Sequence, residues 1–182
     1  MCIRDRNRSL EKISDLKGVT VASNPAEVAS SADIIISILA NDNATQAAYF
    51  DEGGLTSISL LGKLIIEICT TSPDRAVELE YSVKEKGGQF VEAPVGGTVK
   101  PAREGTLLGL VAGYREAFDR AEPILKQLTR RIEYLGDTGA AAAMKLAINL
   151  PLMVYWGALG EAVAMATKKD IPAEQAMSIL VD

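Results

Sequence analysis

Short apolar segments alternate with longer amphipathic or alanine-rich segments along most of the chain. Residues 33–39 (DIIISIL) and 63–69 (KLIIEIC) are almost continuously apolar, which is typical of strands buried on both faces of a parallel sheet. Residues 19–22 (VTVA) have the same β-branched character. Because helical segments separate these strands, the pattern predicts an α/β layer in which helices cover a parallel sheet.

The middle of the chain continues this alternation. Strands are expected at residues 89–95 (QFVEAPV), 106–113 (TLLGLVAG) and 131–136 (RIEYLG). A helix is expected to begin after Ser72, which suits an N-cap, with Pro73 at its first position. Another helix is predicted over residues 114–128 (YREAFDRAEPILKQL), so the whole pattern is that of a doubly wound sheet.

The pattern changes after residue 135 to one long helical run that ends near Lys169, followed by a second helix with Pro172 in its first turn. We therefore expect an α/β domain at residues 7–135 and the start of an all-helical domain at residues 136–182. Residues 1–6 (MCIRDR) show no periodicity and are interpreted as a non-native scar. On this interpretation the chain is a fragment whose first βαβ portion is truncated.

Composition excludes several classes of protein. Hydrophobic residues make up 48% and charged residues 24%, as in ordinary globular proteins. The 19 basic and 24 acidic residues give a net charge of −5 without a basic cluster, so neither a nucleic-acid nor a membrane partner is expected. Polar interruptions of the long apolar run, Lys145 among them, favour a core helix over a membrane span. Only two cysteines are present, which suits a cytoplasmic protein.

The chain contains no histidine, which removes Ser-His-Asp and Cys-His catalysis and most zinc sites, and no metal site is predicted. Lys145 is the leading acid/base candidate because it lies in the apolar run of residues 136–150 (GDTGAAAAMKLAINL), where burial would lower its pKa. Asn149 follows one helical turn later on the same face. The competing interpretation is a lysine that buries only its stem and exposes its ammonium group.

A second candidate site lies in residues 92–107 (EAPVGGTVKPAREGTL), where a strand leads directly into a Gly-Gly loop. The backbone N–H groups of Gly96 and Gly97 can hold a carboxylate or phosphate, because glycine lets an anion approach the main chain. An ordinary turn is the alternative. Taken alone, Arg8 in the segment NRS is an exposed basic side chain, and residues 70–73 (TTSP) are a helix N-cap.

Together and in this order, these segments resemble the β-hydroxyacid dehydrogenase family, which includes 3-hydroxyisobutyrate dehydrogenase and glyoxylate or succinic semialdehyde reductases, and they are also similar to 6-phosphogluconate dehydrogenase. NRS resembles the end of the second strand of a Rossmann fold, SILAND the loop after the fourth, and CTTSP the family's Ser-Thr segment. EAPVGGTVKPAREGTL resembles the substrate loop Asp-Ala-Pro-Val-Ser-Gly-Gly, and GDTGAAAAMKLAINL the signature Gly-x-Gly-x(5)-Lys-x(3)-Asn. The resemblance implies a Rossmann-like, doubly wound parallel sheet followed by a helical substrate and dimerisation domain.

The resemblance also implies hydride transfer between a nicotinamide cofactor and a small hydroxy acid or its semialdehyde. Lys145 would transfer the proton at the substrate oxygen, and Asn149 would orient the substrate. Gly96, Gly97 and Thr98 would bind the substrate carboxylate. A homo-oligomer is expected for the full-length protein, because partner subunits usually help to complete the active site in this family.

The resemblance implies NADP as the cofactor, with NAD possible. Arg8 would meet the 2′-phosphate of NADP, at a position where NAD-dependent enzymes favour an acidic residue. Leu39, Asn41 and Thr70 would line the cofactor.

Several positions depart from the family pattern. Glu92 stands in place of the usual Asp, Gly96 in place of a substrate-binding Ser, and Thr98 in place of the second Gly. The Gly-x-Gly-x-x-Gly turn that holds the pyrophosphate is not in this sequence. These departures leave the substrate open and leave a non-catalytic module for oligomerisation or interaction as the alternative function.

Overall fold

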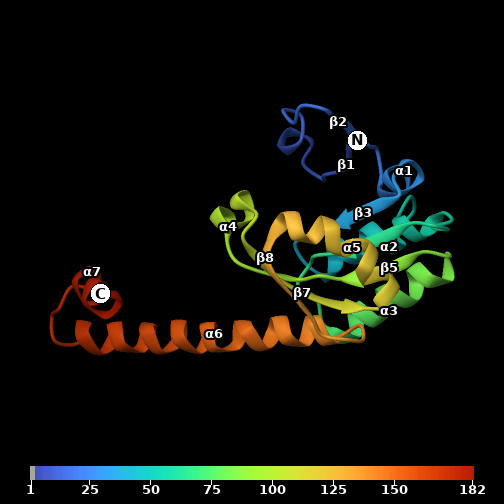
Figure 1. The fold of residues 1–182 in the computed structure, drawn as a ribbon. Helices are drawn as coiled ribbons and strands as arrows, with labels where there is room; N and C mark the ends of the chain where they lie inside the picture. The colour runs from blue at the N-terminus through green and yellow to red at the C-terminus, as the bar shows by residue number, and fades with distance from the viewer. Residues whose placement is uncertain (1–2) are drawn as a thin grey trace. The chain divides into compact units, whose positions relative to one another are not determined.

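The computed structural model describes residues 3–182, which divide into one compact unit ending at Lys145 and a second at Leu146–Asp182 (Figure 1). The first unit begins with a two-stranded parallel sheet formed by β1 (Ile3–Asp5) and β2 (Val19–Val21). A short 3-10 helix (Leu10–Lys12) lies between the two strands, and α1 (Pro25–Ser31) follows them.

Strand β1 lies within the first six residues, for which no secondary structure was expected. Residues 3–5 pair in register with residues 19–21, so they form a strand although the sequence pattern predicted none there. The interpretation of residues 1–6 as a non-native scar stays a prediction. Residues 1 and 2 lie outside the described residues. The three-residue strand is too short to show a periodicity in the sequence, and only its pairing with β2 reveals it.

The centre of the second, six-stranded sheet is parallel. It contains β3 (Ile34–Ser37), β4 (Leu64–Glu67) and β5 (Gln89–Glu92), paired in register. Helix α2 (Asp42–Phe50) and a short 3-10 helix (Leu55–Ser57) connect β3 to β4. Helix α3 (Pro73–Glu85) connects β4 to β5, and the Ser72 side chain accepts a hydrogen bond from the Arg75 N–H, which confirms the predicted N-cap.

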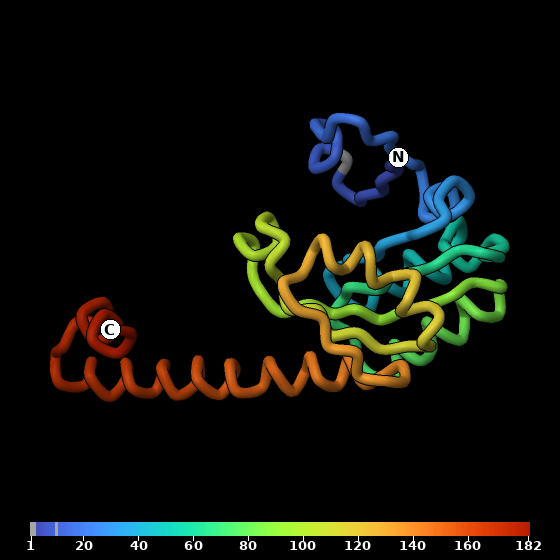
Figure 2. Tube along the Cα trace, viewed as in Figure 1, coloured from blue at the N-terminus to red at the C-terminus, as the bar shows by residue number. Residues whose placement is uncertain are grey.

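The rest of the sheet is mixed, whereas a parallel sheet was expected. Strand β7 (Leu107–Gly113) runs antiparallel to β5 and to the short β6 (Val95–Gly96), and β8 (Thr129–Tyr134) pairs parallel to β7. The chain leaves β6, forms α4 (Val99–Glu104) and returns beside the same strand, as the yellow-green segment in Figure 2 shows. This connection is shorter than the roughly twelve residues that a parallel crossover requires, so the chain returns antiparallel.

Helices cover both faces of this sheet, which confirms the α/β fold. The apolar side chains of α5 (Arg115–Leu128) pack against one face, formed by residues such as Ile66 and Val91. Side chains of α1, α2 and α3 pack against the other face, where Ile65 and Phe90 lie.

Helix α6 (Ala140–Thr167) and helix α7 (Ala173–Val181) complete the chain. The boundary between the compact units falls inside α6, whereas the sequence pattern placed the domain boundary at residue 135. Many apolar side chains of α6, including Leu150 and Trp156, are exposed, in contrast to the expected core helix. By length and composition α6 could cross a membrane, but core helices of soluble proteins meet the same criteria, so this is weak evidence.

Candidate functional site

Three polar side chains form a row across the carboxyl ends of the central strands. Ser37 of β3 is in register with Glu67 of β4, which is in register with Glu92 of β5. Their exposed fractions are 7%, 1% and 2%. In-register residues of parallel strands point to the same face of the sheet. The row therefore places two buried carboxyl groups at the edge where open α/β sheets bind their ligands.

The Glu67 carboxyl group is bonded to two different segments. The Tyr49 hydroxyl on α2 donates to Oε2 at 2.7 Å, and the Cys69 N–H donates to Oε1 at 3.0 Å. The Cys69 Sγ in turn accepts a hydrogen bond from the Leu39 N–H at 2.8 Å. Glu67 and Cys69 thus connect the loop after β3 to the loop after β4.

Cys69 is a structural rather than a reactive cysteine. Burial, reinforced by the neighbouring Glu67, raises the pKa of the Cys69 thiol to about 12. At neutral pH the thiol is protonated, and the thiolate is the form that reacts as a nucleophile. A nucleophilic role for Cys69 therefore does not fit the structure.

The cofactor-binding residues predicted in these loops lie at the same edge. Leu39 is half-buried and reaches the loop of Thr70 through its hydrogen bond to Cys69, the residue before Thr70. Thr70 and Asn41 are exposed. The Asn41 side chain accepts a hydrogen bond from the Ala44 N–H at 3.0 Å, so it caps α2, a role that the sequence analysis did not identify.

Glu92 caps the helix that carries Lys145. One carboxylate oxygen accepts hydrogen bonds from the N–H groups of Gly139 (2.6 Å) and Ala141 (3.0 Å), and the other from Ala142 (3.3 Å). A carboxylate is favoured here because the N–H groups at a helix start lack partners within the helix and carry partial positive charge. Burial raises the pKa of Glu92, and the three N–H donors oppose that rise.

Lys145 follows these capped residues by one turn of α6 and is half-buried. Burial lowers its pKa, in the direction that acid/base catalysis near neutral pH requires. Within residues 3–182 its ammonium group forms no ion pair. Asn149 lies four residues further along α6, in the second compact unit, and its pairing with Lys145 stays a prediction.

The predicted substrate loop begins where β5 ends. Gly96 is the last residue of β6, and Gly97 has a φ of +137°, which favours glycine. Thr98 is exposed and lies at the N-cap of α4, where its side chain caps no N–H group. A Cβ atom at Gly96 would meet Leu108 at an ordinary 3.5 Å, so the backbone would accept the serine that is usual in the family.

Arg8 lies in a different part of the first unit. It lines a pocket of about 380 Å³ at the end of β1, together with Arg6 and Asn7. Ser23, which precedes α1, and Glu27 of α1 also line it. Two arginines at one pocket give it cationic donors of the type that bind a phosphate. The sequence analysis did not identify Arg6, because it interpreted residues 1–6 as a non-native scar.

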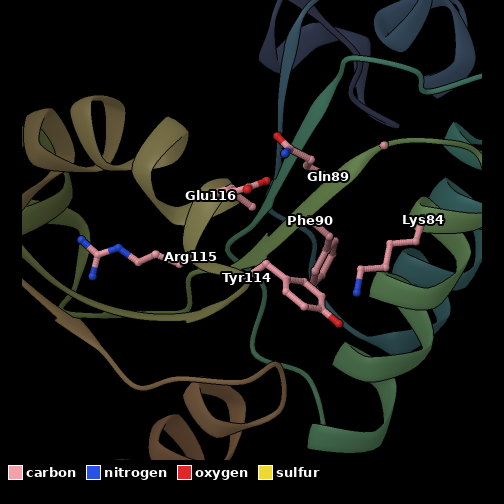
Figure 3. Close-up of a pocket in the computed structure, with 8 residues that line it drawn as sticks. Lys84, Gln89, Phe90, Tyr114, Arg115 and Glu116 are labelled. Atoms are coloured by element: carbon pink, nitrogen blue, oxygen red, sulfur yellow. The ribbon is translucent and has the colours of Figure 1, made fainter.

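A larger pocket of about 470 Å³ contains none of the predicted site residues (Figure 3). Gln89 and Phe90 line it where β5 begins, and Tyr114 and Arg115 where α5 begins. The Lys84 Nζ lies 3.4 Å from the centre of the Tyr114 ring. The pocket is at the amino end of β5, opposite the edge at which such sheets bind ligands, so we do not assign it to the site.

The sequence analysis missed Tyr49 and Glu67 and treated Glu92 only as a departure from a motif. A signal for Glu67 was present, because it is a charged residue inside the apolar strand segment LIIEIC. Charged residues are rarely buried unless they are paired, so such a residue indicates a specific partner. Nothing in the sequence indicated that this partner is Tyr49.

Known proteins are similar to this chain over most of its length. The sequence profile of a family described as the NAD binding domain of 6-phosphogluconate dehydrogenase matches residues 2–136. Glyoxylate/succinic semialdehyde reductase 1 of Arabidopsis thaliana is 33% identical over 176 residues, which are 96% of this chain and 61% of that protein. The cytokine-like nuclear factor N-PAC of Aedes aegypti is 28% identical over 163 residues, which are 90% of this chain and 29% of that protein.

Among solved structures, 3-hydroxyisobutyrate dehydrogenase from Mycobacterium tuberculosis, determined with L-serine, has a TM-score of 0.79 and 27% identity to this chain. The match covers 97% of this chain and 60% of that one. The similarity extends over both the α/β unit and the helical segment. The chain thus spans about three fifths of the length of the reductase and of the dehydrogenase that it matches.

Proposed function

This chain belongs to the β-hydroxyacid dehydrogenase family, and we propose that it acts as an oxidoreductase that transfers a hydride between NADP(H) and a small hydroxy acid or its semialdehyde. The observation that carries the proposal is Lys145, a half-buried lysine with a lowered pKa. Its helix is bonded, through Glu92, to the end of the strand that leads into the Gly96–Gly97 loop.

Two separate groups of residues would bind the dinucleotide, one in the pocket at the end of β1 and one in the loops after β3 and β4. Arg8, with Arg6 beside it, supplies cationic donors for the 2′-phosphate of NADP, and this is the basis for preferring NADP over NAD. Leu39, Asn41 and Thr70 lie at the ends of β3 and β4, where they would line the cofactor. When bound, the nicotinamide supplies or accepts the hydride at the carbinol carbon of the substrate.

Lys145 would transfer the proton to or from the substrate oxygen. In the reductive direction its ammonium group donates a proton to the carbonyl oxygen, and in the oxidative direction its neutral amine accepts the proton of the hydroxyl group. The lowered pKa brings these two forms closer in free energy at neutral pH. The N–H groups around Gly96 and Gly97, with the Thr98 hydroxyl, would hold the substrate carboxylate, and Asn149 would orient the substrate beside Lys145.

The test uses protein expressed from the complete gene. NADPH oxidation is followed at 340 nm with glyoxylate, succinic semialdehyde and related small semialdehydes. Replacing Lys145 with Ala should lower kcat by at least about 100-fold, as expected for loss of a general acid, while the Kd for NADPH changes little. Lys126→Ala is the matched control, because Lys126 is an exposed lysine on α5. Turnover of the Lys145→Ala protein within a few-fold of the parent would reject the assignment.

A non-catalytic module for oligomerisation or interaction is the second candidate, and two relatives are named as nuclear factors and not as dehydrogenases or reductases. Gly96 and Thr98, which replace the residues usual in the substrate loop, favour it. It predicts that the parent protein oxidises no NADPH with any semialdehyde of the panel. The exposed apolar side chains of α6 suit self-association under either function.

A further inference from the structure

The row of buried polar residues contains two carboxyl groups on strands whose other residues on the same face are apolar. Two residues earlier on the same face, β4 and β5 carry Ile65 and Phe90, which pack in an apolar cluster with α2 and α3. Apolar residues at positions 67 and 92 would continue that cluster. A buried carboxyl group is instead unfavourable unless its oxygens find donors, so its presence points to the groups that it holds.

Each carboxyl group bonds to a different element of the proposed site. Glu67 accepts a hydrogen bond from the Cys69 N–H, and the Cys69 Sγ accepts one from the Leu39 N–H. These bonds connect Glu67 to the two loops that would line the cofactor. Glu92 holds the first turn of α6, so its bonds end at the helix of Lys145. The Ala93 N–H also donates to the Glu67 carbonyl oxygen at 2.7 Å, which keeps the two strand ends side by side.

We propose that Glu67 and Glu92 are positioning residues with separate tasks: Glu67 fixes the two cofactor loops, and Glu92 fixes the position of Lys145 relative to the substrate loop. Both carboxyl groups act through the residues that they bond and not by contact with the substrate or the cofactor. The inference rests on the proposed function, because it gives each carboxyl group one half of the same hydride-transfer site to hold.

The variants Glu67→Gln and Glu92→Gln test whether the two carboxyl groups have separate tasks, since each variant is the control for the other. Glu67→Gln keeps one side-chain oxygen, which can accept from either Tyr49 or Cys69. Its NH2 group then faces the other of these two donors, so one hydrogen bond is lost. A glutamine at 92 keeps the oxygen that serves Gly139 and Ala141 and turns an NH2 group toward the Ala142 N–H. Glu85→Gln, at an exposed residue at the end of α3, is the neutral control.

Kinetics on protein from the complete gene should separate the two variants. Glu67→Gln should raise the Kd for NADPH by about threefold to tenfold, the effect of one lost hydrogen bond, with kcat at saturating NADPH nearly unchanged. Glu92→Gln should lower kcat by about tenfold through misplacement of Lys145 and shift the pH profile of kcat, with the Kd for NADPH nearly unchanged. Glu92→Asp retains a carboxylate and should recover part of the lost kcat.

Amide hydrogen exchange supplies a readout that does not depend on activity. Exchange should accelerate at Leu39 and Cys69 in Glu67→Gln only, and at Gly139, Ala141 and Ala142 in Glu92→Gln only. If the parent protein does not bind NADPH, the proposed function fails, while the exchange pattern still decides whether each carboxyl group holds its own segment. Equal changes of Kd, kcat and exchange in both variants would overturn the proposal, because the carboxyl groups would then act only through overall stability.

Discussion

Replacing Tyr49 with Phe tests the physical basis of the Glu67 cluster with the smallest possible change. Tyr49 is 0% exposed, and its hydroxyl donates to Glu67 at 2.7 Å. Burial raises the pKa of Tyr49 well above its usual value, so the hydroxyl stays a neutral donor at every pH at which the protein is handled. The substitution removes this one donor and leaves the aromatic ring in place.

The magnitude follows from what the substitution leaves behind. Hydrogen bonds to charged groups contribute about 1.5–3 kcal/mol, and a buried oxygen left without a donor keeps its full desolvation cost. The ring still fills its site among Leu79 and Ile65, so no large cavity term is added. We therefore expect Tyr49→Phe to lower the free energy of unfolding by about 1.5–3 kcal/mol and the Tm by roughly 3–12 °C.

Urea unfolding followed by far-UV circular dichroism measures this loss, and a double-mutant cycle assigns it. In the cycle, Tyr49→Phe is combined with Glu67→Gln, and the coupling energy should be at least about 1 kcal/mol. Tyr81→Phe is the matched control, because Tyr81 is an exposed tyrosine on α3, and its effect should stay below about 0.5 kcal/mol. A loss for Tyr49→Phe no larger than that of the control, or strictly additive losses in the cycle, would refute the reasoning.

Three further predictions concern single side chains. Arg8→Asp should move cofactor preference from NADPH toward NADH, measured as the ratio of kcat/KM for the two cofactors, and an unchanged ratio would remove Arg8 from the 2′-phosphate site. Cys69, whose pKa is raised to about 12, should resist alkylation by iodoacetamide at pH 7.5 until the protein is unfolded, as followed by peptide mass spectrometry; rapid labelling of the native protein would contradict its burial. Because burial raises the pKa of Glu92 in the folded state, the folded protein binds that proton more tightly than the unfolded chain does. Glu92 should therefore contribute stability that is present below its unfolded pKa and lost as the pH rises through its folded pKa. Urea titrations across this pH range measure the free energy of unfolding. The same pH dependence in Glu92→Gln as in the parent protein would contradict the raised pKa of Glu92.

Local patterns in the sequence predicted the elements that depend on local interactions. Strands β3, β4 and β7 arise from β-branched and apolar runs, and α3 begins at the predicted Ser72 cap, because burial periodicity and capping are decided within a few neighbouring residues. Lys145 was found in the same way, as a charged residue within an apolar helical run. Its half-burial fits both a catalytic lysine and a lysine that buries only its stem, so its catalytic role stays a prediction.

What the sequence could not determine depends on pairing between distant segments. The antiparallel course of β7, the contribution of residues 3–5 to a strand and the bond between Tyr49 and Glu67 each join residues far apart in the chain. Register is the clearest case, because a shift of one residue between β4 and β5 would turn Glu92 to the other face and away from Glu67. From the sequence alone, Lys145 could be identified as an acid/base candidate, because a charged residue within an apolar run is a local feature. The buried row of Ser37, Glu67 and Glu92 became visible only in the fold, since that alignment is a property of strand pairing and not of any single strand.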